Sequence, residues 1–408
     1  MTEQNYYSWR EQGDRLRSLS RYEEAIACYQ KALEIQPDDS YAWYWQGNLL
    51  SDLERYEQAI ASYEKVLEIK PNYDDAWNNR GLALEKLGCY EQAIASYDQA
   101  LKVNPNYRIA WQNRSYALRA LKRDQEAVAN YNKALEMETD YHWGWRSYGD
   151  ALCNCARYEE AISNYEIALD MQPEDHAAWN GRGYALEQLN RYEEAIANYD
   201  KALKINPTDS AVWANRGNAL SKLDRNEEAI ANYDKALVLK PDNYYCWKDR
   251  GLALEKLGQC QEAIISYEQA IEAKPDYEFA WVSRGMLLAN FGRYQEAIAS
   301  YEKAMEIDPE FFWSWGMRGM VLEKLGRYQE AIASLTRATE ICPYYEDGFY
   351  HKARCYAIQG KTTAVIENLQ KTFEINPHSY RHKAATDPTF ELMRDNKHFQ
   401  ALIQKADG

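Results

Sequence analysis

The sequence lacks the short motifs that most enzymes and metal proteins carry. It has no C-x-x-C, no glycine-rich phosphate loop, no G-x-S-x-G and no H-E-x-x-H. The eight cysteines are scattered, which disfavours a zinc site or a disulfide framework and favours reduced thiols. His378 and His382 have the four-residue spacing of a metal pair, but a third ligand is missing. We therefore expect no enzymatic activity, no metal and no cofactor.

The sequence also lacks a concentration of positive charge and any long apolar run. Its formal net charge is -15, whereas nucleic acid and anionic membranes select basic surfaces. No segment approaches the roughly 18 apolar residues of a membrane-spanning helix. The first ten residues are polar and aromatic, without the apolar stretch of a secretory signal. These absences predict a cytoplasmic protein that neither binds nucleic acid nor inserts into a membrane.

Proline is scarce, but its placement is the strongest signal in the chain. Ten of the eleven prolines stand in phase at a spacing of 34 residues, and Thr139 fills the one gap in the series. So strict a period indicates a small structural unit stacked end to end rather than a domain with one cleft. The ten are Pro37, Pro71, Pro105, Pro173, Pro207, Pro241, Pro275, Pro309, Pro343 and Pro377.

Other residues recur at fixed positions of this unit, counting residue 6 as position 1. Trp stands at position 4 in ten units, Gly at position 8 in nine, and Tyr at position 24 in nine. Positions 4, 8 and 11, and then 20, 24 and 27, have helical spacing, so each unit is predicted to hold two amphipathic helices, A and B. Residues 1–5 form a lead-in, residues 6–379 form eleven units, and residues 380–408 form C-terminal capping helices.

These repeated residues resemble the tetratricopeptide repeat (TPR) family. One unit contains Trp77, Gly81, Leu84, Ala93, Tyr97, Ala100 and Pro105, which follow the family pattern. The resemblance covers residues 6–379 and implies an all-α fold, an α-α superhelix of eleven helix pairs whose concave groove, lined by helix A, holds a protein or peptide.

One departure from the family pattern is systematic. Position 7 is Arg in seven units, and this W-x-x-R-G variant resembles bacterial TPR proteins. We expect the Arg stem to cover the Trp one turn earlier, with its head at the surface or over a ring. A basic ligand-binding ladder is the alternative. The seven are Arg80, Arg114, Arg182, Arg216, Arg250, Arg284 and Arg318.

The resemblance also selects candidate groove residues, because positions 2, 5, 6, 9, 12 and 13 line the groove in the family. An apolar set lies in units 9 and 10, where Met and flat aromatics suit an apolar partner segment; packing among these residues or on the tail is the alternative. This set is Phe279, Val282, Met286, Phe312, Trp313, Met317 and Met320.

Two further sets of candidate residues are smaller. Asn at groove positions suits a peptide backbone because one amide both donates and accepts, although Asn is also a common surface residue. The polar set is Asn78, Asn79, Asn113, Asn180, Asn215 and Asn218. A second aromatic cluster consists of Tyr41, Tyr44 and Trp45, with Trp143 standing alone in unit 5.

Two places in the chain deviate from the regular pattern. Unit 4 has Ser115, Asp124 and Thr139 at the positions where other units usually have Gly, an aromatic residue and Pro. Its junction with unit 5 is therefore predicted to bend differently. After residue 379, Asp387 and Pro388 predict an N-cap and the first residue of a helix. This tail resembles the segment that closes bacterial TPR arrays. It caps the last unit, or it detaches and competes for the groove.

The predicted function is a scaffold or adaptor that binds a protein or peptide segment in the concave groove. The alternative is a regulatory subunit that docks on a separately encoded enzyme, such as a protease or glycosyltransferase. The carboxylate clamp of chaperone-binding TPR proteins is not reproduced, because Leu252 follows Lys248 where the clamp needs Asn. The oligomeric state stays open.

Two neighbouring tryptophans test the assignment of helix faces. Trp315 stands at the conserved core position and Trp313 at a groove position. We expect Trp315→Ala to lower the free energy of unfolding by ~3–5 kcal/mol, whereas Trp313→Ala costs little stability. Chemical denaturation of both variants measures this, and equal destabilisation would show that the faces are assigned wrongly.

Overall fold

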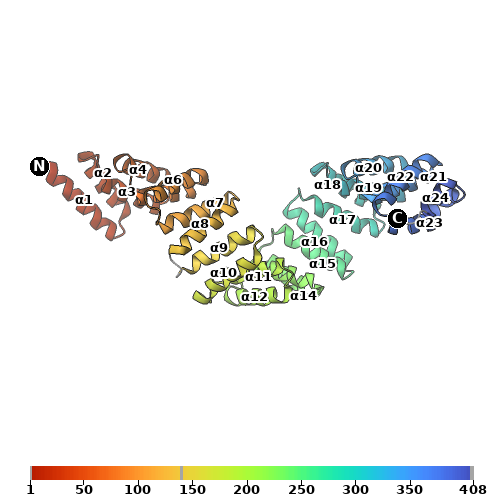
Figure 1. Ribbon diagram of the computed structural model, residues 1–408, viewed down its shortest axis with the longest axis horizontal. Coiled ribbons are helices and arrows are strands. Elements are labelled where there is room, and N and C mark those ends of the chain that lie inside the picture. The colour runs from red at the N-terminus through yellow and green to blue at the C-terminus, as the bar shows by residue number, and fades with distance from the viewer. Residues whose placement is uncertain (1, 138–140, 405–408) are drawn as a thin grey trace. The chain divides into compact units, whose positions relative to one another are not determined.

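The computed structural model describes residues 2–137 and 141–404, and within these ranges the regular structure is helical throughout. Thr139 lies outside the described residues. The chain divides into two compact halves, Met1–Pro207 and Thr208–Gly408, and in each half successive helices pack against their neighbours (Figure 1). The expectation of an all-α fold built from helix pairs is confirmed. No described helix has both the length and the apolar character needed to span a bilayer.

The N-terminal half contains six helix pairs, one for each of the first six units. Helix A of the first unit starts at Thr2, so most of the predicted lead-in is already helical. The helices are α1 (Thr2–Ser18), α2 (Tyr22–Ile35), α3 (Ser40–Asp52), α4 (Tyr56–Ile69), α5 (Asp74–Lys86), α6 (Tyr90–Val103), α7 (Arg108–Ala120), α8 (Asp124–Met137), α9 (His142–Asn154), α10 (Tyr158–Met171), α11 (His176–Gln188) and α12 (Tyr192–Ile205).

The C-terminal half contains five more pairs and the tail. Its paired helices are α13 (Ser210–Lys222), α14 (Asn226–Leu239), α15 (Tyr244–Lys256), α16 (Cys260–Ala273), α17 (Glu278–Asn290), α18 (Tyr294–Ile307), α19 (Phe312–Lys324), α20 (Tyr328–Ile341), α21 (Glu346–Ile358) and α22 (Thr362–Ile375). The tail forms α23 (Pro377–Thr386), the 3-10 helix η1 (Pro388–Met393) and α24 (Lys397–Gln404).

Within a unit, the glycine at position 8 of helix A packs against the tyrosine ring at position 24 of helix B. A Cβ built on Gly81 would lie 2.5 Å from the Tyr97 ring, and one on Gly13 would lie 2.8 Å from Tyr29. The nine position-24 tyrosines are at most 2% exposed, so they form the centre of each unit. Glycine permits so close an approach of the two helices because it has no side chain.

Between units, the recurring tryptophan is hydrogen-bonded to the recurring proline. The indole Nε1 donates to the carbonyl oxygen of the proline six residues earlier, for example Trp77 to Pro71 at 2.9 Å and Trp315 to Pro309 at 3.0 Å. The indole is half-buried at the edge of the core rather than inside it. The expected cost of Trp315→Ala therefore lies at the lower end of the range for a core Trp.

The turn between helices A and B has one fixed backbone conformation. Its second residue, at position 15, has a positive φ in all eleven units, from 55° at Asp224 to 75° at Gly88. Glycine occupies this position in only five units, and Ser20, Glu54, Lys122, Ala156, Asn190 and Asp224 occupy the rest. The helix pairing therefore imposes the left-handed conformation even on residues that resist it.

The tail packs on the last helix pair and buries its own aromatic rings there. Phe390 and Phe399 are at most 2% exposed and share a core with Leu369 and Phe373 of α22. Pro377 opens α23 at its first turn, and the side chain of Asn376 caps the Ser379 N–H.

Polar side chains also hold the C-terminal tail against the preceding helices. Asp387 accepts hydrogen bonds from the Thr389 N–H at 2.9 Å and from the Tyr350 hydroxyl at 2.7 Å, and it is paired with Arg354. Arg354 also donates to buried Glu323 at 2.6 Å. Burial acts to raise the pKa of Asp387, but these hydrogen bonds and the Arg354 charge outweigh it and lower the pKa.

A paired substitution tests the glycine–tyrosine contact. A Cβ on Gly183 would lie 2.6 Å from the Tyr199 ring, so Gly183→Ala is expected to cost ~1–3 kcal/mol of stability through overpacking. Unit 11 naturally combines Ala353 with Leu369. We expect Gly183→Ala with Tyr199→Leu to cost less than the sum of the two single changes, as measured by urea denaturation. Strict additivity would contradict the contact.

The tail network predicts a pH dependence. The folded-state pKa of Asp387 lies below its unfolded value of about 3.9, so its stabilisation is present above that value and is lost as the pH falls through the folded pKa. Asp387→Asn keeps the helix cap but removes the charge. The thermal unfolding midpoint of the wild type should exceed that of Asp387→Asn at pH 7, and the two should converge near pH ~2. An unchanged difference at that pH would contradict this.

Candidate functional site

A row of aromatic rings crosses the first turns of α15 and α17 in the C-terminal half. Tyr244 lies 4.1 Å from Tyr245 and 5.0 Å from Tyr277 between ring centroids, and Tyr277 stacks on Phe279 at 6.1 Å. We call these four residues the aromatic row. Tyr245 is 55% exposed, while burial raises the pKa of Tyr277. The row is thus anchored at one edge and open to solvent at the other.

The predicted apolar residues of unit 10 belong to other groups of contacts. Trp313 is half-buried and meets Phe311 edge-on at 6.5 Å. Phe312 meets Tyr345 edge-on at 5.2 Å, and the Tyr345 hydroxyl approaches the Met320 sulfur at 3.9 Å. Phe312 and Met320 are therefore joined through Tyr345, the last residue of the same unit, which caps α21 of the next unit.

Three of the predicted apolar residues face the core. Val282 is 1% exposed and is part of the buried cluster between α15 and α20, so its assignment to the groove is wrong. Met286 and Met317 are half-buried and pack against that same cluster.

The asparagines of units 3 and 4 bond to one another rather than lying free. Asn113 Nδ2 donates to Asn78 Oδ1 at 3.0 Å, and Asn78 Nδ2 donates to Asn79 Oδ1 at 3.2 Å. Asn79 Nδ2 in turn donates to Asn48 Oδ1 at 3.0 Å and to the Tyr44 hydroxyl at 3.2 Å. Asn78 is only 2% exposed, so its assignment to an accessible groove is wrong.

The remaining predicted asparagines also have partners within the protein. Asn218 Oδ1 accepts from the hydroxyl of buried Tyr233 at 2.9 Å. Asn180 and Asn215 each take part in an interaction of their own. Asn218 therefore satisfies a polar group of the fold, and a ligand would have to compete for its oxygen.

The second aromatic cluster is packed and supported by two arginines. Tyr44 contacts Trp45 at 5.5 Å and Tyr73 at 5.0 Å. The Arg17 guanidinium lies 3.4 Å from the Trp45 ring centroid, and Arg10 lies 4.9 Å from that of Tyr41. The Tyr41 hydroxyl donates to Asp14 at 2.9 Å. Trp143 of unit 5 is similarly covered by Arg146 at 4.4 Å, but remains 46% exposed.

The arginines at position 7 connect neighbouring units. Arg284 Nε donates to Glu268 in the preceding helix B at 2.9 Å, and Arg284 Nη1 donates to Ser300 in its own helix B at 2.7 Å. Arg80 makes the same two bonds, to Glu64 and Ser96. These contacts agree with heads that lie at the surface or over a ring, because the paired Glu64 and Glu268 are 49% and 45% exposed and the Arg250 guanidinium lies 5.8 Å from the Trp247 ring centroid. Those ion pairs also weaken the case for a basic ligand ladder.

Sequence reasoning missed part of the aromatic row and the lysine beside it. Tyr244 and Tyr277 occupy positions 1 and 34, which precede the predicted groove positions, and Lys274 occupies position 31 in the loop. The Lys274 ammonium lies 4.7 Å from the Tyr244 ring centroid. Its hydrogen bond to the Tyr244 hydroxyl raises the lysine pKa. Comparing positions 31 and 34 between units would have revealed these residues.

The chain belongs to the tetratricopeptide repeat family. Family models described as tetratricopeptide repeat match residues 149–210, 74–107, 279–311, 217–280, 198–231, 300–333 and 109–141, and a model described as TPR repeat matches residues 13–53 and 47–88. Together these matches span both halves, and the fold class is the α-α solenoid that the resemblance implies. No curated protein matches the chain.

Solved structures with a similar arrangement are distant in sequence. Yeast Tom70 is 14% identical over all of both chains, with a TM-score of 0.44. A tetratricopeptide repeat protein from Parabacteroides merdae is 17% identical over 62% of this chain and 99% of its own, with a TM-score of 0.48. YrrB, described as a TPR protein with an unusual peptide-binding site, is 22% identical over 45% of this chain and 95% of its own, with a TM-score of 0.39.

Proposed function

We propose that this protein is an interaction scaffold that binds a segment of a partner protein against its A helices, and that it catalyses no reaction itself. The family supports the general role, since repeat arrays of this kind present extended binding surfaces. The observation that carries the proposal is the aromatic row, whose Tyr245 ring is 55% exposed beside half-buried Phe279. Exposed aromatic rings in a continuous group are typical of sites that bind proteins.

The charges around the aromatic row favour a partner segment that is apolar and weakly charged. Lys248 Nζ is paired with Asp249 at 2.7 Å, and Lys274 bonds to the Tyr244 hydroxyl. Both lysines next to the row therefore already have partners within the protein. A site that binds acidic ligands would instead keep its lysines free for the ligand. Burial raises the pKa of Asp249, against the lowering effect of its ion pair with Lys248.

Selection of peptides from a random library on the immobilised full chain tests the proposal. Peptides that bind the wild type should bind Tyr245→Ala with Phe279→Ala about tenfold more weakly, because anchor rings dominate such interfaces. Isothermal titration calorimetry measures the affinities.

Tyr344→Ala is the matched control, because Tyr344 is 78% exposed in a loop outside the row. The Tyr344→Ala variant should bind the selected peptides with the same affinity as the wild type. If the selected peptides bind the double variant as well as the wild type, or if the library yields no binder, the aromatic row is not the binding surface that we propose.

A further inference from the structure

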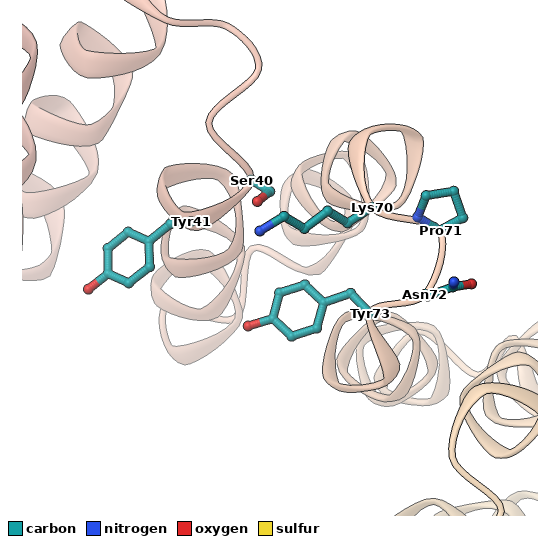
Figure 2. A pocket seen from close by; sticks show the side chains of 6 residues that line it. All are labelled: Ser40, Tyr41, Lys70, Pro71, Asn72 and Tyr73. Carbon is teal, nitrogen blue, oxygen red and sulfur yellow. The ribbon is translucent and has the colours of Figure 1, made fainter.

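A cavity of about 430 Å³ opens between the first and last residues of the second unit. It lies where α3 begins and where the loop from α4 to α5 turns, and it is lined by Ser40, Tyr41, Lys70, Pro71, Asn72 and Tyr73. Figure 2 shows the Lys70 side chain extending toward Ser40, with the Tyr73 ring beside it and the Tyr41 ring across the opening.

Three of these residue types recur at the same positions six repeats later, together with a tyrosine in place of Ser40. Tyr245, Lys274 and Tyr277 occupy the positions of Tyr41, Lys70 and Tyr73, and Tyr244 stands where the earlier unit has Ser40. The chain therefore contains two versions of one arrangement, a lysine between two tyrosines, which differ at position 1.

In the later unit, the Tyr244 ring shows how an aromatic group is held in this arrangement. Its centroid lies 4.7 Å from the Lys274 ammonium, and its edge meets the Tyr277 ring at 5.0 Å. A phenol ring there makes a cation–π contact and an edge-to-face contact at once. Ser40, which is 5% exposed, is too short to reach either group, so the earlier unit keeps the space open.

The walls of the open cavity are held in place before anything binds. The Tyr41 hydroxyl donates to Asp14 at 2.9 Å and Arg10 lies 4.9 Å from the Tyr41 ring, while Tyr44 packs on Tyr73 at 5.0 Å. Among the described residues, neither a hydrogen bond nor an ion pair engages the exposed Lys70 ammonium. The pocket walls are already ordered, so a ligand does not bear the entropic cost of ordering them when it binds. The Lys70 ammonium is available to contact such a ligand.

We propose that this pocket binds an aromatic side chain of a partner protein, whose ring takes the place that Tyr244 fills in the later unit. The inference rests on the proposed scaffold function, which supplies the partner. The ring would lie against the Lys70 ammonium and the Tyr73 ring. A multiply charged anion fits less well, because the Asp75 and Asp74 carboxylates act on this site. Burial first, and then Tyr44 and these carboxylates, raise the pKa of Tyr73 to about 12.

Small blocked amino acids test the pocket on the full chain without a known partner. N-acetyl-tyrosinamide should bind the wild type and N-acetyl-leucinamide should bind at least several-fold more weakly, as measured by ligand-detected NMR titration. Ser40→Tyr copies the later unit and should abolish tyrosinamide binding. Ser210→Tyr, which adds the same ring at position 1 of unit 7, should leave it unchanged.

A second pair of variants tests the cation. Lys70→Gln should weaken tyrosinamide binding about threefold, the size of a partly exposed cation–π contact. Lys274→Gln alters the lysine of the later unit and should have no effect. Equal binding of the two blocked amino acids, undiminished binding to Ser40→Tyr, or no binding at all would each overturn the pocket assignment.

The outcomes separate this inference from the scaffold proposal. If library peptides bind through the aromatic row while tyrosinamide does not bind here, only the pocket inference fails. If tyrosinamide binds and is blocked by Ser40→Tyr while the library yields no binder, the pocket stands as an aromatic site and the scaffold proposal fails.

Discussion

The contact between a glycine of helix A and a tyrosine ring of helix B is the constraint on which eight of the eleven units depend. The ring occupies the space that a side chain at position 8 would take, as at Gly217 and Tyr233, where a Cβ would lie 2.6 Å from the ring. The ring is buried, so its hydroxyl needs a partner, and residues of helix A such as Asp150 and Asn218 accept from it. One close approach thus fixes both the packing and the polar contacts of the pair.

Links between units rest on a second set of fixed contacts. Where a proline precedes the tryptophan, as at Pro275 and Trp281, the hydrogen bond between them joins helix A to the loop before it, and the arginines at position 7 join successive B helices. These contacts leave positions 31, 34, 1 and 2 outside the repeated framework. Those four positions vary from Asp39 and Ser40 to Tyr277 and Phe279, and they supply both the aromatic row and the open cavity. In our account, the repeated contacts hold the units together, and the residues at positions 31, 34, 1 and 2 determine what each unit can bind.

The sequence was sufficient to predict the helix pairs, because period, proline phase and helical spacing all report on contacts repeated in every unit. It was insufficient for the site, because side-chain direction at one position differs between units. Val282 and Asn78 share position 5 with Tyr44, yet the first two are buried and the last is half-buried. Hydrogen bonds among asparagines, and a lysine between two tyrosines of adjacent helices, depend on distances that a linear pattern does not contain.

Hydrogen exchange, followed by mass spectrometry with and without a saturating library-selected peptide, tests the central claim most directly. If the A helices bind the partner through the variable positions, protection should rise in the first turns of α15 and α17, which carry the aromatic row. Protection confined to the outer surfaces of the B helices, such as α16 and α18, would contradict the account.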